Sequence, residues 1–401
     1  MANLTNIKKG NEARSYLVLG VRQLELNIEW GMVPGSSNWP VLRAASDEML
    51  HLDVLRFVAS AGVVVHHSFE FLLPAAMRSE RPTGLALFVD LFFVISGFVI
   101  AHVYQGKVGT LAGYGSFLQR RVGRLVPLHL LTLFISIAVW AIIVALGKSG
   151  NHEPSFDPRC IVETAFFIHT LVLCGNGVSF SSVSWSIGAE MIMYLIFPGF
   201  AWLVIRTRVG FIFATVLALI TAIVIDSVQN VGLRSWVDLW PAFRALPSFM
   251  VGVSVFCLRD KISRIPMPGP LLLFSLVLLI FSMVTEKPHI LVIGIVYAVV
   301  ITAVAADAQR VISKSVRRLA PLGQLTYSIY MWHSLVILIV MNAIGDKLLH
   351  APIGLMCMLG LCSYAITFGV SYFSYFAVET PARRFIDNLG SNPRRTVPAT
   401  S

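Results

Sequence analysis

Residues 52–73 read LDVLRFVASAGVVVHHSFEFLL, an apolar stretch that nevertheless contains Arg56, His66 and His67. Placing an ionisable side chain inside such a segment costs roughly 2.5–3.5 kcal/mol or more in a membrane. Side chains that are kept there despite this cost are therefore candidates for a functional role. In a helix, Arg56 and His67 would share one face, about 16 Å apart along the axis, whereas His66 would point about 100° away. A neutral imidazole can take a proton from a hydroxyl nucleophile, so we interpret His67 as a candidate catalytic base.

Two carboxylates fall at a similar depth in two other apolar stretches. Asp90 lies in FVDLFFVISGF and Glu190 lies in SVSWSIGAEMIMYLIFP. At about 1.5 Å per helical residue, both come about 8–10 Å below the same membrane edge as His67, where a carboxylate would fix the imidazole tautomer. Taken singly, the histidine could be an interhelical hydrogen bond and Asp90 a helix cap. The shared depth favours catalysis, with Glu190 as the first choice of partner and Asp90 as the second.

A basic cluster is expected at the opposite membrane edge, where FLQRRVGR places Arg120, Arg121 and Arg124 near Arg56. Guanidinium groups bind phosphates in a bidentate way, although arginines at a cytosolic edge are also common without any ligand. With His67 at the far side, the pattern indicates a substrate that carries phosphates at one end and a reactive group more than ten ångströms away. Acyl-coenzyme A fits that description.

The composition explains why these groups count as intramembrane. Of 401 residues, 56% are hydrophobic and only 13% are charged, whereas soluble domains are about 45–50% apolar and about 25% charged. We therefore predict a polytopic membrane protein, whose net charge of +10 reflects the positive-inside bias rather than nucleic-acid binding. The five cysteines have no metal-like spacing, so no metal site is expected; Cys160 and Cys174 could form a disulfide, but we favour two buried thiols.

The hydropathy pattern predicts an all-α protein with about ten transmembrane helices and a short re-entrant or interfacial helix at 161–174. Alternate loops hold 13 basic residues against 7 in the others, which places both termini in the cytosol of a multi-pass protein of the inner (plasma) membrane. We predict a cytosolic extension over 1–49, a membrane acyltransferase domain over 50–387 and a short cytosolic tail over 388–401. The expected spans are 52–74, 85–105, 122–147, 183–205, 209–227, 240–258, 269–285, 289–306, 325–346 and 353–378.

Six short motifs occur along the chain, namely LDVLRFVASAGVVVHH, VDLFFVISGF, FLQRRVGRLVPLHL, SSVSWSIGAEMIMYLIFP, LGQLTYSIYMWHSLV and VETPARRF. In this order and spacing the chain resembles the integral-membrane acyltransferase-3 family over roughly residues 50–387. The resemblance implies a ten-span fold in which His67, rather than His66, is the essential histidine and Arg56 is its motif partner. Among the motif residues, we expect substrate contacts from Ser96, Trp185, Ser186, Tyr330 and His333.

The resemblance also implies the reaction. An acyl group, most often acetyl, would pass from cytosolic acyl-CoA to a hydroxyl of an extracytoplasmic carbohydrate or lipid-linked glycan, such as lipopolysaccharide or exopolysaccharide. Acetyl-CoA would be a donor substrate, and no permanently bound cofactor is expected. His67 would act as general base or carry the acyl group transiently. Many relatives add a soluble hydrolase-like domain after the membrane core; none is recognisable here, so we expect direct transfer from the membrane core.

A transporter or flippase for a glycan or small metabolite is the main alternative, because polar layers at two depths also describe a substrate path. The sequence has neither an internal repeat nor a matching pair of Gly/Pro-broken spans, which favours the enzyme. A scaffold or sensor would leave the intramembrane charges unexplained.

Overall fold

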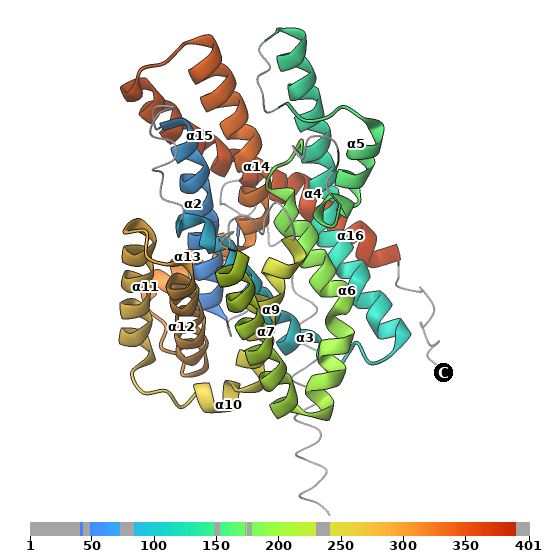
Figure 1. Cartoon of the computed structure of the whole chain (residues 1–401), viewed down its shortest axis with the longest axis vertical. Coiled ribbons are helices and arrows are strands. Elements are labelled where there is room, and N and C mark those ends of the chain that lie inside the picture. The colour runs from blue at the N-terminus through green and yellow to red at the C-terminus, as the bar shows by residue number, and fades with distance from the viewer. Residues whose placement is uncertain are drawn as a thin grey trace, which may run out of the picture. The chain divides into compact units, whose positions relative to one another are not determined.

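The computed structural model describes residues 41–42, 49–72, 84–147, 153–172, 174, 179–229 and 241–389. Two units divide the chain, Met1–Val41 and Leu42–Ser401, and the helices below belong to the second. Most of the predicted extension over 1–49 and of the tail over 388–401 lies outside the described residues. Within the described part the secondary structure is helical without a strand, which confirms the all-α prediction (Figure 1).

The described helices overlap all ten segments predicted as spans. Six of them are long and apolar enough to cross a membrane, and three shorter apolar helices accompany them. The helix that carries Arg56 and His67 is not among the six. The count of ten spans and the cytosolic termini therefore stay predictions. The helices are α2 (Leu50–Leu72), α3 (Phe88–Tyr104), α4 (Leu111–Ala145), α5 (Pro158–Ala165), α6 (Ser184–Arg206), α7 (Arg208–Gln229), α9 (Pro241–Cys257), α10 (Arg259–Ile262), α11 (Pro268–Val284), α12 (His289–Ala308), α13 (Lys314–Leu319), α14 (Thr326–Ile337), α15 (Ile353–Ser374) and α16 (Thr380–Leu389).

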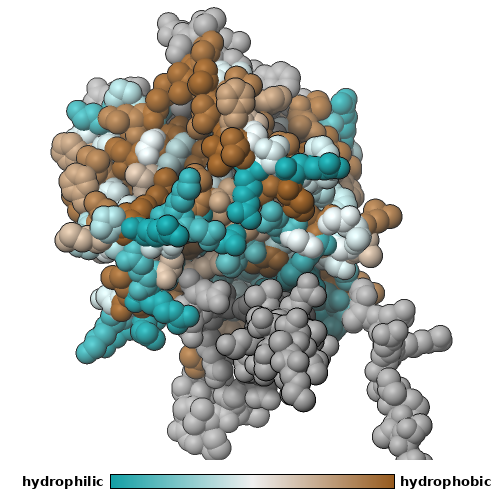
Figure 2. Space-filling view, turned by 90° about the horizontal axis from the view of Figure 1, so that it is seen from below, coloured by the Kyte–Doolittle hydropathy of each residue, from teal (hydrophilic) through white to brown (hydrophobic). Residues whose placement is uncertain are grey.

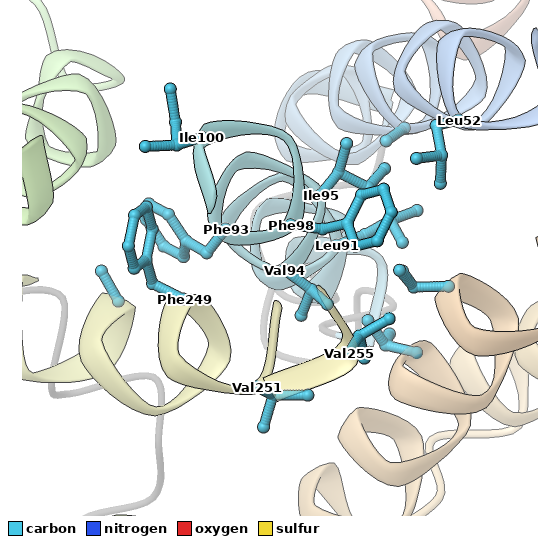
Figure 3. Packing of buried hydrophobic residues seen from close by; sticks show 14 of the residues in the cluster. Leu52, Leu91, Phe93, Val94, Ile95, Phe98, Ile100, Phe249, Val251 and Val255 are labelled. Carbon is cyan, nitrogen blue, oxygen red and sulfur yellow. The ribbon is translucent and has the colours of Figure 1, made fainter. Parts of the chain in front are cut away.

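Helix α3 forms the centre of the bundle, since 83% of an 18-residue apolar stretch within Gly84–Tyr104 is buried. Its packing against α9 is very close, because a Cβ on Gly97 would lie 2.1 Å from the carbonyl oxygen of Phe249. Gly252 on α9 is equally close to the backbone of α3, and small residues allow such helix contacts in membranes. Figure 3 shows large apolar side chains of both helices interlocking around this contact, among them Val94 and Val255.

Helix α4 begins earlier than the predicted span at 122. Its 35 residues start at Leu111, where the side chain of Thr110 caps the helix by accepting a hydrogen bond from the Gly113 amide at 3.1 Å. The basic motif therefore lies inside the helix and not in a loop before it. This continuous helix fixes the spacing of the arginines and buries one of them, Arg121, against aromatic rings.

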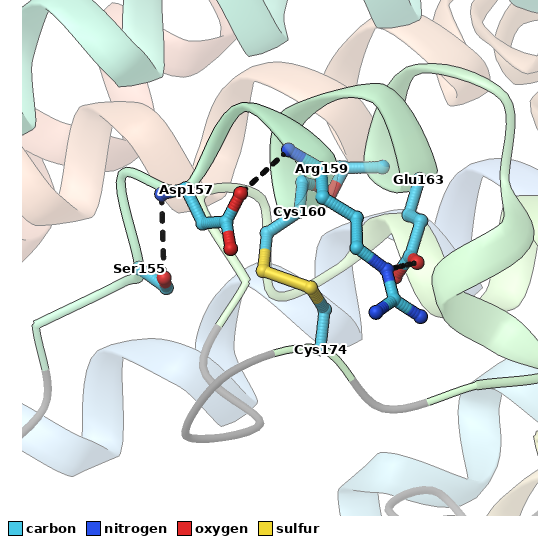
Figure 4. The surroundings of a disulfide bond; sticks show 7 residues. Ser155, Asp157, Arg159, Cys160, Glu163 and Cys174 are labelled. Carbon is cyan, nitrogen blue, oxygen red and sulfur yellow. Dashed lines mark hydrogen bonds and ion pairs between the residues drawn. A yellow bond between two sulfur atoms is a disulfide. The ribbon is translucent and has the colours of Figure 1, made fainter.

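The prediction of two free thiols at Cys160 and Cys174 is wrong, because the two residues form a disulfide (Figure 4). Helix α5 starts at Pro158 behind an N-cap, Asp157, and a 3-10 turn, η3 (Ile168–Thr170), follows it. The chain thus doubles back so that its two ends meet, a juxtaposition that sequence spacing alone does not reveal. In place of the single short helix expected over 161–174, the described residues there contain the end of α5 and the turn η3.

The chain between Cys160 and Cys174, called the strapped segment below, packs against the start of α6 through its turn η3. A Cβ on Gly188 would lie 2.2 Å from the Thr170 side chain, and His169 Nε2 lies 3.0 Å from the Ser184 hydroxyl. Burial and the neighbouring His129 lower the pKa of His169 to about 4, so the imidazole is neutral at pH 7. The segment therefore holds the first turn of α6 through packing and a neutral hydrogen bond.

The face seen from below in Figure 2 carries many hydrophilic side chains (teal) between patches of hydrophobic ones (brown). Helix α10 lies at this lower end in Figure 1 and exposes Asp260 and Lys261. The helical bundle thus ends in a polar surface here, as an apolar bundle must where it meets water.

Candidate active site

A pocket with about 720 Å³ of empty space, its open mouth included, lies between α2, α3, α4, α6 and α14. Seven of the twelve predicted site residues line it. They are polar or charged and come from five helices that are distant in sequence, so their convergence is a result of tertiary packing. The seven are Arg56, Ser96, Arg121, Arg124, Ser186, Glu190 and Tyr330.

Helices α2 and α14 run in the same direction along this pocket. Gly323, just before α14, lies against Asp53 in the first turn of α2, and His333 contacts His67 farther along both helices. The start of α2, which carries Arg56, therefore lies beside the residues just before α14, and the later part of α2, which carries His67, lies beside α14 itself. On α6, Ser186 lies toward the His67 end of the pocket and Tyr194 lies toward the arginine end, about 12 Å apart along the helix.

Three guanidinium groups line one end of the pocket. Arg56 forms an ion pair of 3.3 Å with Asp53 on its own helix. Arg121 donates a hydrogen bond of 3.0 Å to the Tyr104 hydroxyl and lies 5.2 Å over its ring, while Arg124 completes the cluster. Like charges repel at this range, and a bound phosphate offsets that repulsion, so the cluster is suited to a polyanion.

Glu190 lies on the arginine side of the pocket. Its carboxylate accepts a hydrogen bond of 2.6 Å from the Ser96 hydroxyl and another from Tyr194, whose ring lies 5.8 Å from the Arg121 guanidinium. These contacts join α3 to α6. Orientation of His67 by Glu190 is not among the described hydrogen bonds, so a catalytic role of Glu190 stays a prediction.

His67 has other neighbours. Its Nδ1 lies 4.0 Å from the carboxylate of Glu70, one turn along α2, and its ring centroid lies 5.1 Å from His66 and 5.2 Å from His333. Sequence reasoning missed Glu70, although its spacing of three residues from His67 places the two on one helix face. The side chain of His67 is about one third exposed (30%), which leaves room for a reactant.

Asp90 is engaged in an ion pair of its own. Its carboxylate lies 2.7 Å from Arg244 on α9, and both side chains are buried. The guanidinium of Arg244 also stacks over Trp185 at 5.2 Å, which places this predicted substrate residue beside the pair. The ion pair of Asp90 joins α3 to α9, and a catalytic role of Asp90 stays a prediction. Arg244 went unnoticed because the segment 240–258 reads as an ordinary span.

The tyrosines and serine of the YSIYMWH motif connect α14 to three other helical elements. Tyr330 bonds with Ser186 on α6 at 2.6 Å, Tyr327 donates to the carbonyl of Leu125 on α4, and Ser328 donates to Glu379 near the start of α16. This fixes Tyr330 in the pocket wall, with the ring of His333 5.5 Å behind it. The end of the pocket opposite the arginines therefore adjoins His333, which in turn contacts His67.

Arg120 is not one of the residues that line the pocket, although it is next to Arg121 in sequence. Adjacent helical residues point about 100° apart, so only one of the two can face the cavity fully. Of the four arginines predicted to bind phosphate, Arg56, Arg121 and Arg124 line the pocket. Phosphate binding by these residues stays a prediction.

The described helices form an apolar bundle with a pocket that three arginines line, and His67 lies next to this pocket through its contact with His333. The arrangement is compatible with a membrane acyltransferase, and the comparison with known families identifies the class. Residues 49–375 match the Acyl_transf_3 model, described as an acyltransferase domain, so the chain belongs to the acyltransferase-3 family.

Curated relatives match parts of the chain, and two of the three that follow have acyltransferase or O-acetyltransferase in their names. A protein of the picA locus of Rhizobium radiobacter is 30% identical over 158 residues, which cover 39% of this chain and 75% of that protein. Acyltransferase MdmB of Streptomyces mycarofaciens is 27% identical over 27% of each chain. A Staphylococcus aureus (strain COL) protein with O-acetyltransferase in its name is 24% identical, and the match covers 83% of this chain but 57% of that protein. No solved structure matches the chain significantly.

Proposed function

We propose that the protein transfers an acyl group, with acetyl as the first candidate, from acyl-CoA to a hydroxyl of an extracytoplasmic carbohydrate or lipid-linked glycan. One observation carries the proposal. A single pocket has three guanidinium groups at one end and adjoins, through Tyr330 and His333, the imidazole of His67 at the other. Membership of the acyltransferase family and the names of two relatives support the same reaction.

The donor would bind with its phosphates at the arginine end. Arg56, Arg121 and Arg124 offer planar, permanently charged groups for the phosphates of coenzyme A. The thioester arm would extend along α6, past the Glu190 and Ser96 pair, whose oxygens can hold the amides of the arm. Glu190 is thereby proposed as a donor-positioning group, and Asp90 as a buried strut between α3 and α9.

Transfer would then occur beside His67. The imidazole takes the proton of the acceptor hydroxyl, the oxygen forms a bond with the acyl carbon, and the carbon–sulfur bond breaks. The proton passes from His67 to the leaving thiolate, which departs as coenzyme A. Attack by His67 itself, followed by transfer from an acyl-histidine, has the same balance and the same requirement for a neutral imidazole.

The two ends of the pocket would face opposite sides of the inner membrane, with the arginines toward the cytosol, where acyl-CoA is available. The disulfide strap on α5 lies next to the start of α6, at the His67 end. Disulfides persist in oxidising compartments, which supports an extracytoplasmic position for this end and hence for the acceptor.

Cleavage of [14C]acetyl-CoA by the purified full chain in lipid nanodiscs tests the proposal, with water as the acceptor in place of the carbohydrate hydroxyl and coenzyme A release measured by chromatography. We expect activity in the wild type, loss of at least 100-fold in His67→Ala and little change in His66→Ala, the matched neighbour. Acetyl-histidine trapped by acid quenching would choose the covalent route. Cleavage that is absent from the wild type, or unchanged in His67→Ala, would overturn the proposed function and leave a transport role to be tested.

A further inference from the structure

His333 is the most completely buried ionisable group near His67, with no exposed surface. Its Nδ1 lies 2.6 Å from the backbone carbonyl oxygen of Tyr330. A carbonyl only accepts hydrogen bonds, so Nδ1 carries the proton of the neutral imidazole and Nε2 carries a lone pair. The backbone of α14 therefore fixes His333 in one tautomer.

The lone pair at Nε2 is buried and has no hydrogen-bond partner among the residues that the structure describes. Buried polar atoms are normally paired, and an unpaired one beside a candidate catalytic group calls for an explanation, of which a catalytic role is one. The neighbouring Tyr330 hydroxyl is already engaged with Ser186 and with the carbonyl of Val183. The missing donor must come from another group.

His67 is the candidate donor in contact with His333. Their ring centroids are 5.2 Å apart and the rings are inclined by 39°. An N–H···N bond of about 2.9 Å joins two imidazoles at a centroid separation of roughly 5 Å, so a rotation of the partly exposed His67 ring suffices to form the bond. The same cluster has no metal-binding geometry within the described part of the chain.

We propose that His333 positions the imidazole of His67 by accepting a hydrogen bond from it at Nε2. The inference rests on the proposed acyltransferase function. When His67 takes the proton of the acceptor hydroxyl, both of its nitrogens carry hydrogen. One N–H then faces the reacting atoms and the other donates to His333, which holds the ring in register with the thioester and stabilises the positive charge. No proton passes to His333.

Glu70 is the competing partner, since its carboxylate lies 4.0 Å from Nδ1 of His67. Its side chain is 36% exposed, so water competes for the contact, whereas His333 is held in a dry site. Other titratable groups on the packed helices are His66 in contact on α2, Tyr330 on α14, and Asp90 on α3, which is paired with Arg244. The two partners for His67 can be separated by substitution.

The test compares His333→Phe, His333→Asn and His333→Gln in the full chain by acetyl-CoA cleavage across pH. Phe has no acceptor, and the Asn amide reaches only the Nδ1 position. The Gln amide oxygen reaches the Nε2 position. We expect Phe and Asn to lower kcat about 10-fold or more, with KM for acetyl-CoA within about twofold, while Gln keeps at least about a third of kcat. The acid limb should move to lower pH in Phe and Asn, because the imidazolium of His67 loses its acceptor, and should stay in place in Gln.

Equal losses in all three variants with an unmoved acid limb would overturn the inference and leave His333 a packing residue. It also fails if Glu70→Gln moves the limb and His333→Phe does not, or if His333→Phe and His333→Asn match the wild type. These outcomes are distinct from failure of the proposed function, in which the wild type itself does not cleave acetyl-CoA. Thermal stabilisation by acetyl-CoA checks that each variant is folded and binds the donor, and Asn serves where Phe does not fold.

Discussion

The hydroxyl of Tyr330 on α14 lies 2.6 Å from the hydroxyl of Ser186 on α6, and both lie 3.2 Å from the carbonyl oxygen of Val183. The two hydroxyl protons are thus shared among three oxygen atoms within hydrogen-bond distance of one another, and this fixes both side chains in the pocket wall. The contact joins two helices whose motifs are more than 140 residues apart in sequence. It sets the position of the pocket end that adjoins His333 and His67.

Tyr330→Phe should lower acetyl-CoA cleavage about 10-fold while costing about 1 kcal/mol of stability, because Ser186 keeps its bond to Val183. Activity and thermal unfolding in detergent measure the two effects. Tyr297→Phe is a matched control, since Tyr297 bonds to Ser248 at 3.1 Å and does not line the pocket. Equal activity losses in the two variants would contradict a specific role for Tyr330.

Arg121→Lys should raise KM for acetyl-CoA about 10-fold, because an ammonium keeps the charge and loses the planar fork that binds phosphate and stacks on Tyr104. Arg120→Lys is the control one residue away, outside the pocket lining, and its KM should stay within about twofold. Steady-state kinetics over a range of acetyl-CoA concentrations separates the two. If Arg120→Lys weakens the donor as much as Arg121→Lys, the assignment of the arginine end is incorrect.

Asp90→Asn should destabilise the protein by about 3–5 kcal/mol, because it leaves the buried guanidinium of Arg244 without a counter-charge. The double variant Asp90→Asn with Arg244→Met should recover part of that loss and keep acetyl-CoA cleavage. Thermal unfolding with an activity assay on the folded fraction checks both. A single variant that stays as stable as the wild type and loses kcat would show Asp90 to be catalytic instead.

Cys160→Ser should destabilise the strapped segment by about 3 kcal/mol, the value expected for a closed loop of roughly 15 residues. The two cysteines are 14 residues apart in sequence. In intact membranes, alkylation should label Cys160 and Cys174 only after reduction. Cys357→Ser, which removes an exposed free thiol, should leave the unfolding temperature unchanged. Labelling of both residues without a reductant would refute the disulfide.

Much of the site was predictable because helical periodicity is local. The spacing of Arg56 and His67 follows from 3.6 residues per turn, and the motif order indicated the family that the match over 49–375 confirms. The apolar helices lie within a few residues of their predicted positions, except α4, where the cap from Thr110 to the Gly113 amide starts the helix several turns before its apolar part. Depth along a helix, in contrast, does not give the distance between side chains on different helices.

Depth alone grouped Asp90 and Glu190 with His67, but the described contacts separate the three. Asp90 pairs with Arg244, and Glu190 bonds to Ser96 and Tyr194. Depth does not specify the rotation of each helix about its axis, which decides the face on which a carboxylate lies. Rotation is set by close contacts such as Gly97 against Phe249, and these depend on the packing of the whole bundle.

The sequence by itself determined that this chain is a helical membrane protein of the acyltransferase family, because composition, periodicity and motif order are properties of the chain read in one dimension. Only the tertiary structure decided that His333 contacts His67, which arginines line the pocket, and that Cys160 meets Cys174. These are pairings between or around helices. They are fixed by how side chains interlock in three dimensions, where a change of one helix face moves a group by several ångströms.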